Sequence, residues 1–385
     1  MRYQVHPLPE DRLEPVAEMA SGIAAATTVH EVFRALFVFA SRTSPADGIF
    51  VASYDPAAGV RHCVYSANVL IDADGRAALE EDADLVIFPP LPLNRGPQSR
   101  AIVTGEPVIT PDLDAAVVGL PRVDSGSDFD ERPPRSSLAV PFAFEDRVLG
   151  AFEVQSTSPG AFADIHVPGL RMAATLAAIA VRNLEFLERE RAQNEATLRA
   201  LGLALEYRDY ETKGHTDRVV ETSLAFGAAL GLSESTLQAL RWGAYLHDLG
   251  KVAISDTILL KPGRLSDEEF AVVRRHTLIG VEMCADIPFL PSEARAVVRS
   301  HHERWDGGGY PDRVSGESIP LLARMFSLVD VYDALTSERP YKRAWSHAAA
   351  IAQLTAGAGT QFDPALVPVF VEVAEGLRAA SESRG

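Results

Sequence analysis

The stretch that decides the fold of this chain is His301-His302-Glu303-Arg304-Trp305-Asp306-Gly307-Gly308-Gly309-Tyr310-Pro311. Two adjacent imidazoles precede a glycine-rich loop that ends in a proline. Glycine adopts backbone angles that other residues avoid and proline fixes φ, so a tight turn is predicted beside the histidines. Imidazoles and carboxylates are ligands that Fe, Mn and Zn accept. The stretch therefore indicates a metal site.

Further residues of metal-ligand type lie on both sides of this stretch. They are Glu211, His215, the adjacent pair His247 and Asp248, His276, and Asp330. A single histidine is more often a hydrogen-bonded core or surface residue than a ligand. Together with His301 and His302, this set nevertheless contains five of the ten histidines. Glu211 and His215 are four residues apart in a stretch with helical character, which predicts that one helix presents both on one face. The whole set predicts a multinuclear metallohydrolase.

Three segments carry a family resemblance: Tyr245 to Pro262, His301 to Pro311, and Ser327 to Lys342. In this order they resemble the signature of the HD-GYP branch of the HD-domain phosphohydrolases, over about residues 200 to 375. The resemblance implies an all-helical phosphodiesterase domain that hydrolyses cyclic di-GMP to pGpG, with further cleavage to GMP left open.

The resemblance also implies which residues hold metal. His215, His247, Asp248 and Asp330 are similar to the core ligands of the wider superfamily, and His276, His301 and His302 to those of a second ion. Glu211 resembles the carboxylate of a three-metal subgroup, the alternative being a solvated helix carboxylate. Two or three divalent ions are thus expected, Fe or Mn by resemblance.

The expected chemistry is hydrolysis of a phosphodiester by water, because a metal lowers the pKa of bound water enough to supply hydroxide. Asp248 is the natural carboxylate to bridge two ions, and Lys251 lies close enough in sequence to contact phosphate as a point charge. These two are the predicted catalytic residues. The resemblance adds three further substrate contacts, Asp333, Arg339 and Lys342.

The loop Gly309-Tyr310-Pro311 has two interpretations. In the resemblance it shapes the site and contacts a diguanylate cyclase or another signalling protein. The alternative is a tight surface turn. The function has alternatives as well: a catalytically silent cyclic di-GMP receptor, or an HD phosphohydrolase acting on another nucleotide such as cyclic GMP-AMP.

The pattern before residue 200 is different in kind. A helical stretch from about Leu13 to Ser41 is followed by short apolar runs typical of strands, and the last two of these form a predicted β-hairpin. The predicted strands are 48–54, 60–66, 107–110, 138–144 and 148–154. This order resembles a GAF domain, a small-ligand or signal-sensing module whose ligand the residues do not specify.

The predicted fold class is therefore an α/β GAF-like N-terminal domain, a long connecting helix and an all-α HD-GYP C-terminal domain. The expected boundaries are 1–165, 166–205 and 206–385. Apolar residues at steps of three and four give a heptad pattern in the connecting segment, which favours a parallel dimeric signalling helix over a helix that packs only on its own domains. The seam is Leu170, Ala173, Ala177, Ala180, Leu184, Leu187, Leu198, Leu201 and Leu205, with the polar residues Arg191 and Asn194 at the intervening seam positions.

Composition excludes several classes of protein. A formal charge of -17 argues against general binding to nucleic acid or to anionic membranes. The N-terminus lacks an apolar signal core and no run of about 18 apolar residues is evident, so a cytoplasmic protein without membrane insertion is expected. The two cysteines, Cys63 and Cys284, imply no disulfide framework.

Overall fold

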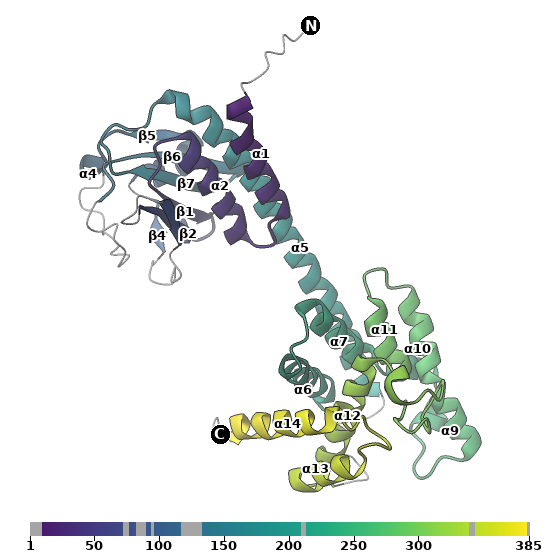
Figure 1. Cartoon of the computed structure of the whole chain (residues 1–385). Coiled ribbons are helices and arrows are strands. Elements are labelled where there is room, and N and C mark those ends of the chain that lie inside the picture. The colour runs from purple at the N-terminus through teal and green to yellow at the C-terminus, as the bar shows by residue number, and fades with distance from the viewer. Residues whose placement is uncertain are drawn as a thin grey trace. The chain divides into compact units, whose positions relative to one another are not determined.

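The computed structural model describes residues 10–71, 77–81, 90–93, 96–116, 133–208, 213–338 and 343–382. The chain divides into two compact units, residues 1–190 and 191–385. Each unit has its own hydrophobic core. Most elements of both are labelled in Figure 1.

The first unit is built on a seven-stranded antiparallel sheet. The strand order is β3-β2-β1-β7-β6-β5, and β4 pairs with β2. The strands are β1 (Gly48–Asp55), β2 (Val60–Ile71), β3 (Ala77–Glu81), β4 (Leu91–Pro92), β5 (Val108–Thr110), β6 (Ser136–Phe144) and β7 (Arg147–Ser156). The five strands predicted from the sequence are confirmed: four extend beyond the predicted ends, β5 begins one residue later, and β3 and β4 are added.

Alternating side chains divide the sheet into two faces, because successive residues of a strand point to opposite sides. Phe152 and Val154 of β7 join the main core with helices α1, α2 and α5, whereas Ala151 lies in a small cluster with α3. The helices of this unit are α1 (Glu10–Ala25), α2 (Val29–Thr43), α3 (Pro97–Thr104), α4 (Leu113–Ala116), η3 (Asp164–His166) and the first part of α5 (Val167–Arg208). Figure 1 shows α1 and α2 on one face of the sheet.

The single helical stretch expected from Leu13 to Ser41 is wrong: the chain forms two helices there. Thr28 caps α2, its side chain accepts a hydrogen bond from the Glu31 backbone N–H, and the Glu31 carboxylate accepts one from the Thr28 N–H. This reciprocal capping box starts a new helix and ends the old one before it.

The second unit is helical. After the end of α5 come α6 (His215–Ala229), α7 (Glu234–Leu246), η4 (Leu249–Ala253), α8 (Asp256–Leu259), α9 (Asp267–Arg274), α10 (His276–Ala285), α11 (Ser292–Ser300), η5 (Gly316–Ser318), α12 (Leu321–Thr336), α13 (His347–Ala356) and α14 (Leu366–Glu382). Phe226 of α6, Phe326 of α12 and Phe370 of α14 are fully buried in its core. The predicted fold class, a GAF-like α/β domain followed by an all-helical domain, is confirmed.

Helix α5 contributes to the core of each unit. Leu170, Ala173 and Ala177 are buried in the first core, and Leu198 and Leu205 in the second. These five positions belong to the predicted heptad seam, so that seam is largely occupied by packing within the chain. A helix that packs on its own domains is the interpretation that fits these residues.

By length and composition, a segment of the described chain, Asp164–Arg208, could cross a membrane. Its most apolar window has a mean hydropathy of 1.2 and is 33% buried. Core helices of soluble proteins meet the same criterion, and the buried positions above belong to this helix. The absence of membrane insertion stays a prediction.

Candidate metal centre

Helix ends of the second unit deliver most of the predicted ligands to one place. His215 is the first residue of α6 and His276 the first of α10, while His247 and His301 directly follow the last residues of α7 and α11. Asp330 comes from the middle of α12. Because these helices share one core, their ends converge, and the four histidines are almost completely buried.

The converging side chains form two groups, in each of which the ligand atoms lie within 4.8 Å of one another. His215, His247 and Asp330 make one group, which we call site A. The second group, site B, is Asp248, His276, His301 and His302. Either group offers the mixture of imidazole and carboxylate that first-row transition metals accept.

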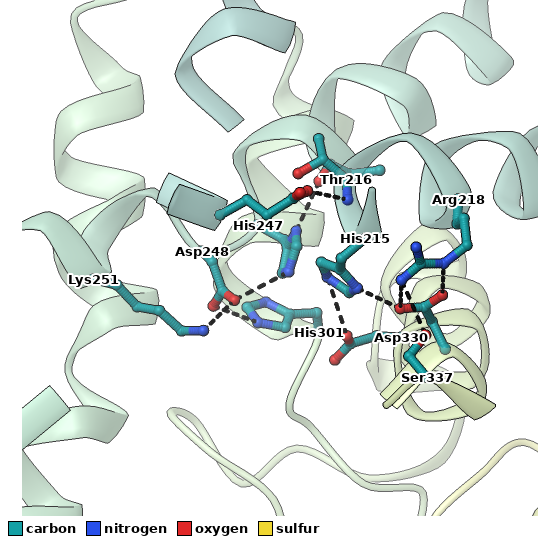
Figure 2. Close-up of polar contacts among 12 residues, drawn as sticks. His215, Thr216, Arg218, His247, Asp248, Lys251, His301, Asp330 and Ser337 are labelled. Atoms are coloured by element: carbon teal, nitrogen blue, oxygen red, sulfur yellow. Dashed lines mark hydrogen bonds and ion pairs between the residues drawn. The ribbon is translucent and has the colours of Figure 1, made fainter. Parts of the chain in front are cut away.

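Asp248 joins the two sites, as Figure 2 shows for its contact with His247. Its Oδ1 lies 3.2 Å from His276 Nε2 and 3.8 Å from His301 Nε2. Its Oδ2 lies 3.2 Å from His247 Nε2. One carboxylate oxygen therefore faces each site, which is the arrangement a bridging ligand requires.

The other ring nitrogens fix the orientation of these histidines. Nδ1 lies 2.7 Å from the Ala244 carbonyl in His247, 2.8 Å from the Val273 carbonyl in His276, and 3.1 Å from the Val297 carbonyl in His301. A carbonyl can only accept, so each Nδ1 carries the proton and each Nε2 presents a lone pair. The Nε2 atoms of His276 and His301 are 3.5 Å apart. Two lone pairs that face each other repel. A cation that both nitrogens coordinate would remove this repulsion, so these residues fit a metal ion.

Burial keeps His301 and His302 of site B in the neutral form that binds metal. Desolvation, followed by the neighbouring His302 and His247, holds the pKa of His301 well below its usual range. Desolvation also lowers the pKa of His302 to about 3. Burial opposes ionisation of Asp248, but the Lys251 ammonium and His247 outweigh it and hold the pKa of that carboxyl well below normal. The neutral imidazoles of His301 and His302 thus lie in the same site as an ionised carboxylate.

Lys251 lies beside Asp248, as the spacing predicted. The Lys251 ammonium is 2.6 Å from Asp248 Oδ2, and the side chain is largely covered. The short helix η4 places it there, because its backbone N–H donates to the Asp248 carbonyl at the start of that turn. The positively charged Lys251 ammonium therefore lies next to the Asp248 carboxylate (Figure 2).

Asp333 is engaged by protein groups. Its Oδ2 accepts a hydrogen bond from His215 Nδ1 at 2.7 Å, and Arg218 donates to both oxygens at 2.6 and 3.0 Å. Although burial opposes it, these two partners lower the pKa of Asp333. This geometry indicates that Asp333 orients the His215 ring. It does not favour the substrate contact that the resemblance implies for Asp333. The sequence analysis missed Arg218, whose only local signal is its place three residues after His215.

The loop after His302 is tied to the same centre. Glu303 accepts hydrogen bonds from the backbone N–H groups of Asp312 and Arg313, at 2.6 and 3.0 Å. A Cβ on Gly309 would lie 2.4 Å from the Arg304 nitrogen, so only glycine allows this close approach. The Tyr310 ring packs on His302 with centroids 4.8 Å apart, and Tyr310-Pro311 is a cis peptide. The loop covers site B.

Three predicted site residues, Glu211, Arg339 and Lys342, lie outside the described residues. The expectation that one helix carries both Glu211 and His215 is wrong, because α6 begins at His215. The preceding residue, Gly214, has φ +82, a left-handed conformation that a continuous α-helix does not contain. The spacing of four therefore does not imply a shared helix face.

Two protein families match the chain, one for each unit. Residues 26–182 match the GAF domain, and residues 182–366 match the HD domain. The chain therefore contains a region similar to the GAF domain followed by a region similar to the HD domain, in the predicted order.

Three relatives are similar to about half of this chain. A cyclic di-GMP phosphodiesterase response regulator, RpfG, of Xanthomonas campestris is 45% identical over 189 residues, covering 49% of this chain and 49% of the relative. A cyclic di-GMP phosphodiesterase of Vibrio cholerae is 40% identical over 209 residues, covering 50% and 42%. The 3'3'-cGAMP-specific phosphodiesterase 2 of the same species is 39% identical over 173 residues, covering 45% and 33%. The chain thus spans half or less of the length of these relatives.

Proposed function

We propose that this protein is a metal-dependent phosphodiesterase of the HD-GYP type that hydrolyses cyclic di-GMP to pGpG, with GMP as a further product to be tested. The proposal rests on one observation: sites A and B are two groups of histidine and carboxylate side chains, and the two oxygens of Asp248 join them. Two relatives that are named cyclic di-GMP phosphodiesterases support cyclic di-GMP as the substrate. They are 45% and 40% identical to this chain over the matched residues.

The proposed ligands are His215, His247, Asp248 and Asp330 at site A, and Asp248, His276, His301 and His302 at site B. Fe or Mn suits these nitrogen and oxygen ligands, and Glu211 is proposed as a ligand of a third ion. Bound ions would make water acidic enough to supply hydroxide and would offset charge on the phosphate oxygens.

The protein groups have separate tasks in this mechanism. Asp248 is held ionised between the two sites, and the Lys251 ammonium is close enough to attract a non-bridging phosphate oxygen. Asp333 keeps the His215 ring oriented. The buried imidazoles exclude water from the far side of the site, so charges interact more strongly there. Arg339 and Lys342 are proposed as contacts to the phosphate and guanine.

The proposal extends to the whole molecule. Residues 1–165 would sense a signal, 166–205 would connect, and 206–385 would catalyse, in a cytoplasmic homodimer. The loop Gly309-Tyr310-Pro311 is proposed as a contact for a diguanylate cyclase or other signalling protein. Tyr310 packs inward on His302, which supports a role of this loop in shaping the site as well.

The decisive test is hydrolysis of cyclic di-GMP by the full-length protein, purified without oxygen and supplied with Mn²⁺ or Fe²⁺. Chromatography separates pGpG from GMP. Asp248→Ala should abolish turnover and lower metal content together, since it removes a ligand of both sites. Asp286→Ala, at the exposed end of α10, is the matched control and should behave as wild type.

The outcomes separate the alternatives. Cleavage of 3'3'-cGAMP in preference to cyclic di-GMP would move the substrate assignment toward that of the third relative. Metal binding and tight cyclic di-GMP binding without cleavage would favour the receptor. An Asp248→Ala variant with full metal content and activity would contradict the bridging assignment.

A further inference from the structure

The last turn of α5 holds two charged side chains that touch the segments carrying the site. Glu206 is almost completely buried, with 7% of its surface exposed, and Arg208 is the final residue of the helix. Both lie within the second unit, so their contacts belong to the HD domain. Neither is a metal-type ligand in the groups described above.

Glu206 caps the helix that begins with His215. Its Oε1 accepts a hydrogen bond from the Gly214 N–H at 2.6 Å, and its Oε2 accepts one from the Thr216 N–H at 3.0 Å. Helix α6 receives no cap from the side chain of its own N-cap residue, Gly214. The first N–H groups of a helix need such acceptors, and a carboxylate also complements the helix dipole. Glu206 thus fixes the backbone on both sides of His215.

Arg208 caps the turn that carries Lys251. Its guanidinium donates to the Lys251 carbonyl at 3.0 Å, to the Val252 carbonyl and to the Ile254 carbonyl at 2.7 Å. A further bond reaches Asp256 Oδ1 at 3.0 Å. A cation at the carbonyl end of a helical turn satisfies acceptors that the turn leaves over. Arg208 therefore fixes the backbone of the residue whose ammonium contacts Asp248.

Backbone packing gives α5 no room to slip relative to these segments. A Cβ at Gly202 would lie 2.7 Å from the Tyr245 carbonyl oxygen and 3.0 Å from Thr216 Cγ2. One turn before the two caps, the helix thus already abuts α7, which ends at the His247-Asp248 pair, and α6. A shift of the end of α5 would be transmitted to sites A and B together.

We propose that Glu206 and Arg208 are positioning residues: Glu206 sets His215 for metal binding, and Arg208 sets Lys251 for turnover. The end of α5 is then the point at which a change in this helix alters the activity of the centre. The role of Arg208 rests on the proposed phosphodiesterase function. The role of Glu206 can be tested by metal affinity alone, without a turnover assay.

For Glu206 the measurement is Mn²⁺ affinity of the full-length protein by chelator competition. Glu206→Gln keeps the shape but loses the charge, and we expect about tenfold weaker Mn²⁺ binding, as for other groups that orient ligands. If this variant does not fold by circular dichroism, Glu206→Asp keeps the charge and shortens the reach, and the same loss is expected. Wild-type affinity in a folded variant would overturn the assignment.

For Arg208 the measurement is turnover of cyclic di-GMP and of bis(4-nitrophenyl) phosphate, a generic phosphodiester, at saturating Mn²⁺. Arg208→Gln should lower kcat about tenfold or more while KM and Mn²⁺ content change less than about twofold, because misplacement of a catalytic group acts on the transition state. Arg208→Lys should not restore kcat, since an ammonium cannot reach all these carbonyls at once.

Arg199→Gln is the matched control for both residues. Arg199 lies on the same helix and makes a bidentate ion pair with Asp217 in the first turn of α6, but both side chains are exposed and neither bonds to the backbone beside His215 or Lys251. Its kcat and Mn²⁺ affinity should stay at wild-type values. An equal loss of kcat or Mn²⁺ affinity in Arg199→Gln would mean that any contact with α5 matters. That result would overturn a specific role of Glu206 and Arg208. If the wild type binds Mn²⁺ but cleaves neither diester, the proposed function fails while Glu206→Gln still decides the positioning role.

Discussion

Lys251 is the single residue whose substitution best separates metal binding from catalysis. Its ammonium contacts Asp248 but is not a ligand, because it has no lone pair while protonated. We expect Lys251→Ala to keep its metal content within about twofold and to lose about 100-fold in kcat, the usual effect of removing one electrostatic stabiliser. Metal analysis and steady-state kinetics on the same preparation test this.

The control for Lys251 is another lysine with a carboxylate partner. Lys261 pairs with Glu269 at 2.6 Å on the exposed side of the domain, so Lys261→Ala should keep wild-type turnover. A Lys251→Ala protein that loses metal in proportion to activity would show that this ammonium stabilises the ionised form of Asp248 rather than the reaction.

The sequence identifies site residues through local pairs and fails for partners that only the fold brings together. The pairs His247-Asp248 and His301-His302 are visible as adjacent ligands. The partnership of Asp333 with Arg218 is not visible, since the two are separated by 115 positions and a carboxylate does not specify its partner. Glu206 is only eight residues from Gly214, yet no local pattern indicates that its carboxylate accepts a hydrogen bond from the Gly214 N–H.

At the scale of elements, the site depends on the close approach of η4 and α10. A Cβ on Gly250 would lie 1.9 Å from the His276 carbonyl oxygen and 2.6 Å from the Gly280 nitrogen. Gly250→Ala must push the two elements apart and with them Asp248 and His276. We expect a loss of about 1–3 kcal/mol in the free energy of unfolding, the usual cost of overpacking, and weaker Mn²⁺ binding. Denaturant unfolding and chelator competition measure both.

Gly376 provides the opposite case in the same domain. It lies inside α14, and an added Cβ would meet nothing within 4 Å. Gly376→Ala should therefore stabilise the protein by about 0.5–1 kcal/mol through helix propensity, with unchanged Mn²⁺ affinity. If Gly250→Ala were as stable as wild type and bound Mn²⁺ equally well, tight contact between η4 and α10 would not be a condition for the site.

Element boundaries show a similar limit of local patterns. The hairpin of β6 and β7 was predictable because alternating apolar residues flank a polar turn. The break between α1 and α2 was also encoded, in Thr28 and Glu31, but helical periodicity on both sides conceals a capping box. Gly214 is a clearer sequence signal of a helix boundary, because this glycine has a left-handed conformation directly before α6.

At the scale of the whole molecule, α5 presents a second apolar stripe that the predicted seam did not include. Met172, Ile179 and Phe186 are spaced by seven residues and are 37%, 41% and 66% exposed. A repeat of seven is the spacing with which a helix packs along a partner helix. Helix α5 thus has two apolar faces: one packs into the cores, and the other is exposed within the chain.

We therefore expect the protein to dimerise through this stripe, which we test by replacing Ile179 and Phe186 with glutamate. Charges at two positions of a paired helix repel across the interface, so the mass measured by sedimentation equilibrium should roughly halve. Both side chains are largely exposed within the chain, so the thermal unfolding midpoint of the monomer should not fall by core disruption. Val103→Glu, at an exposed position of α3 outside α5, is the control and should leave the dimer intact. A wild-type protein that sediments as a monomer, or a double variant that remains dimeric, would remove this stripe as the interface and leave α5 as a connector within one chain.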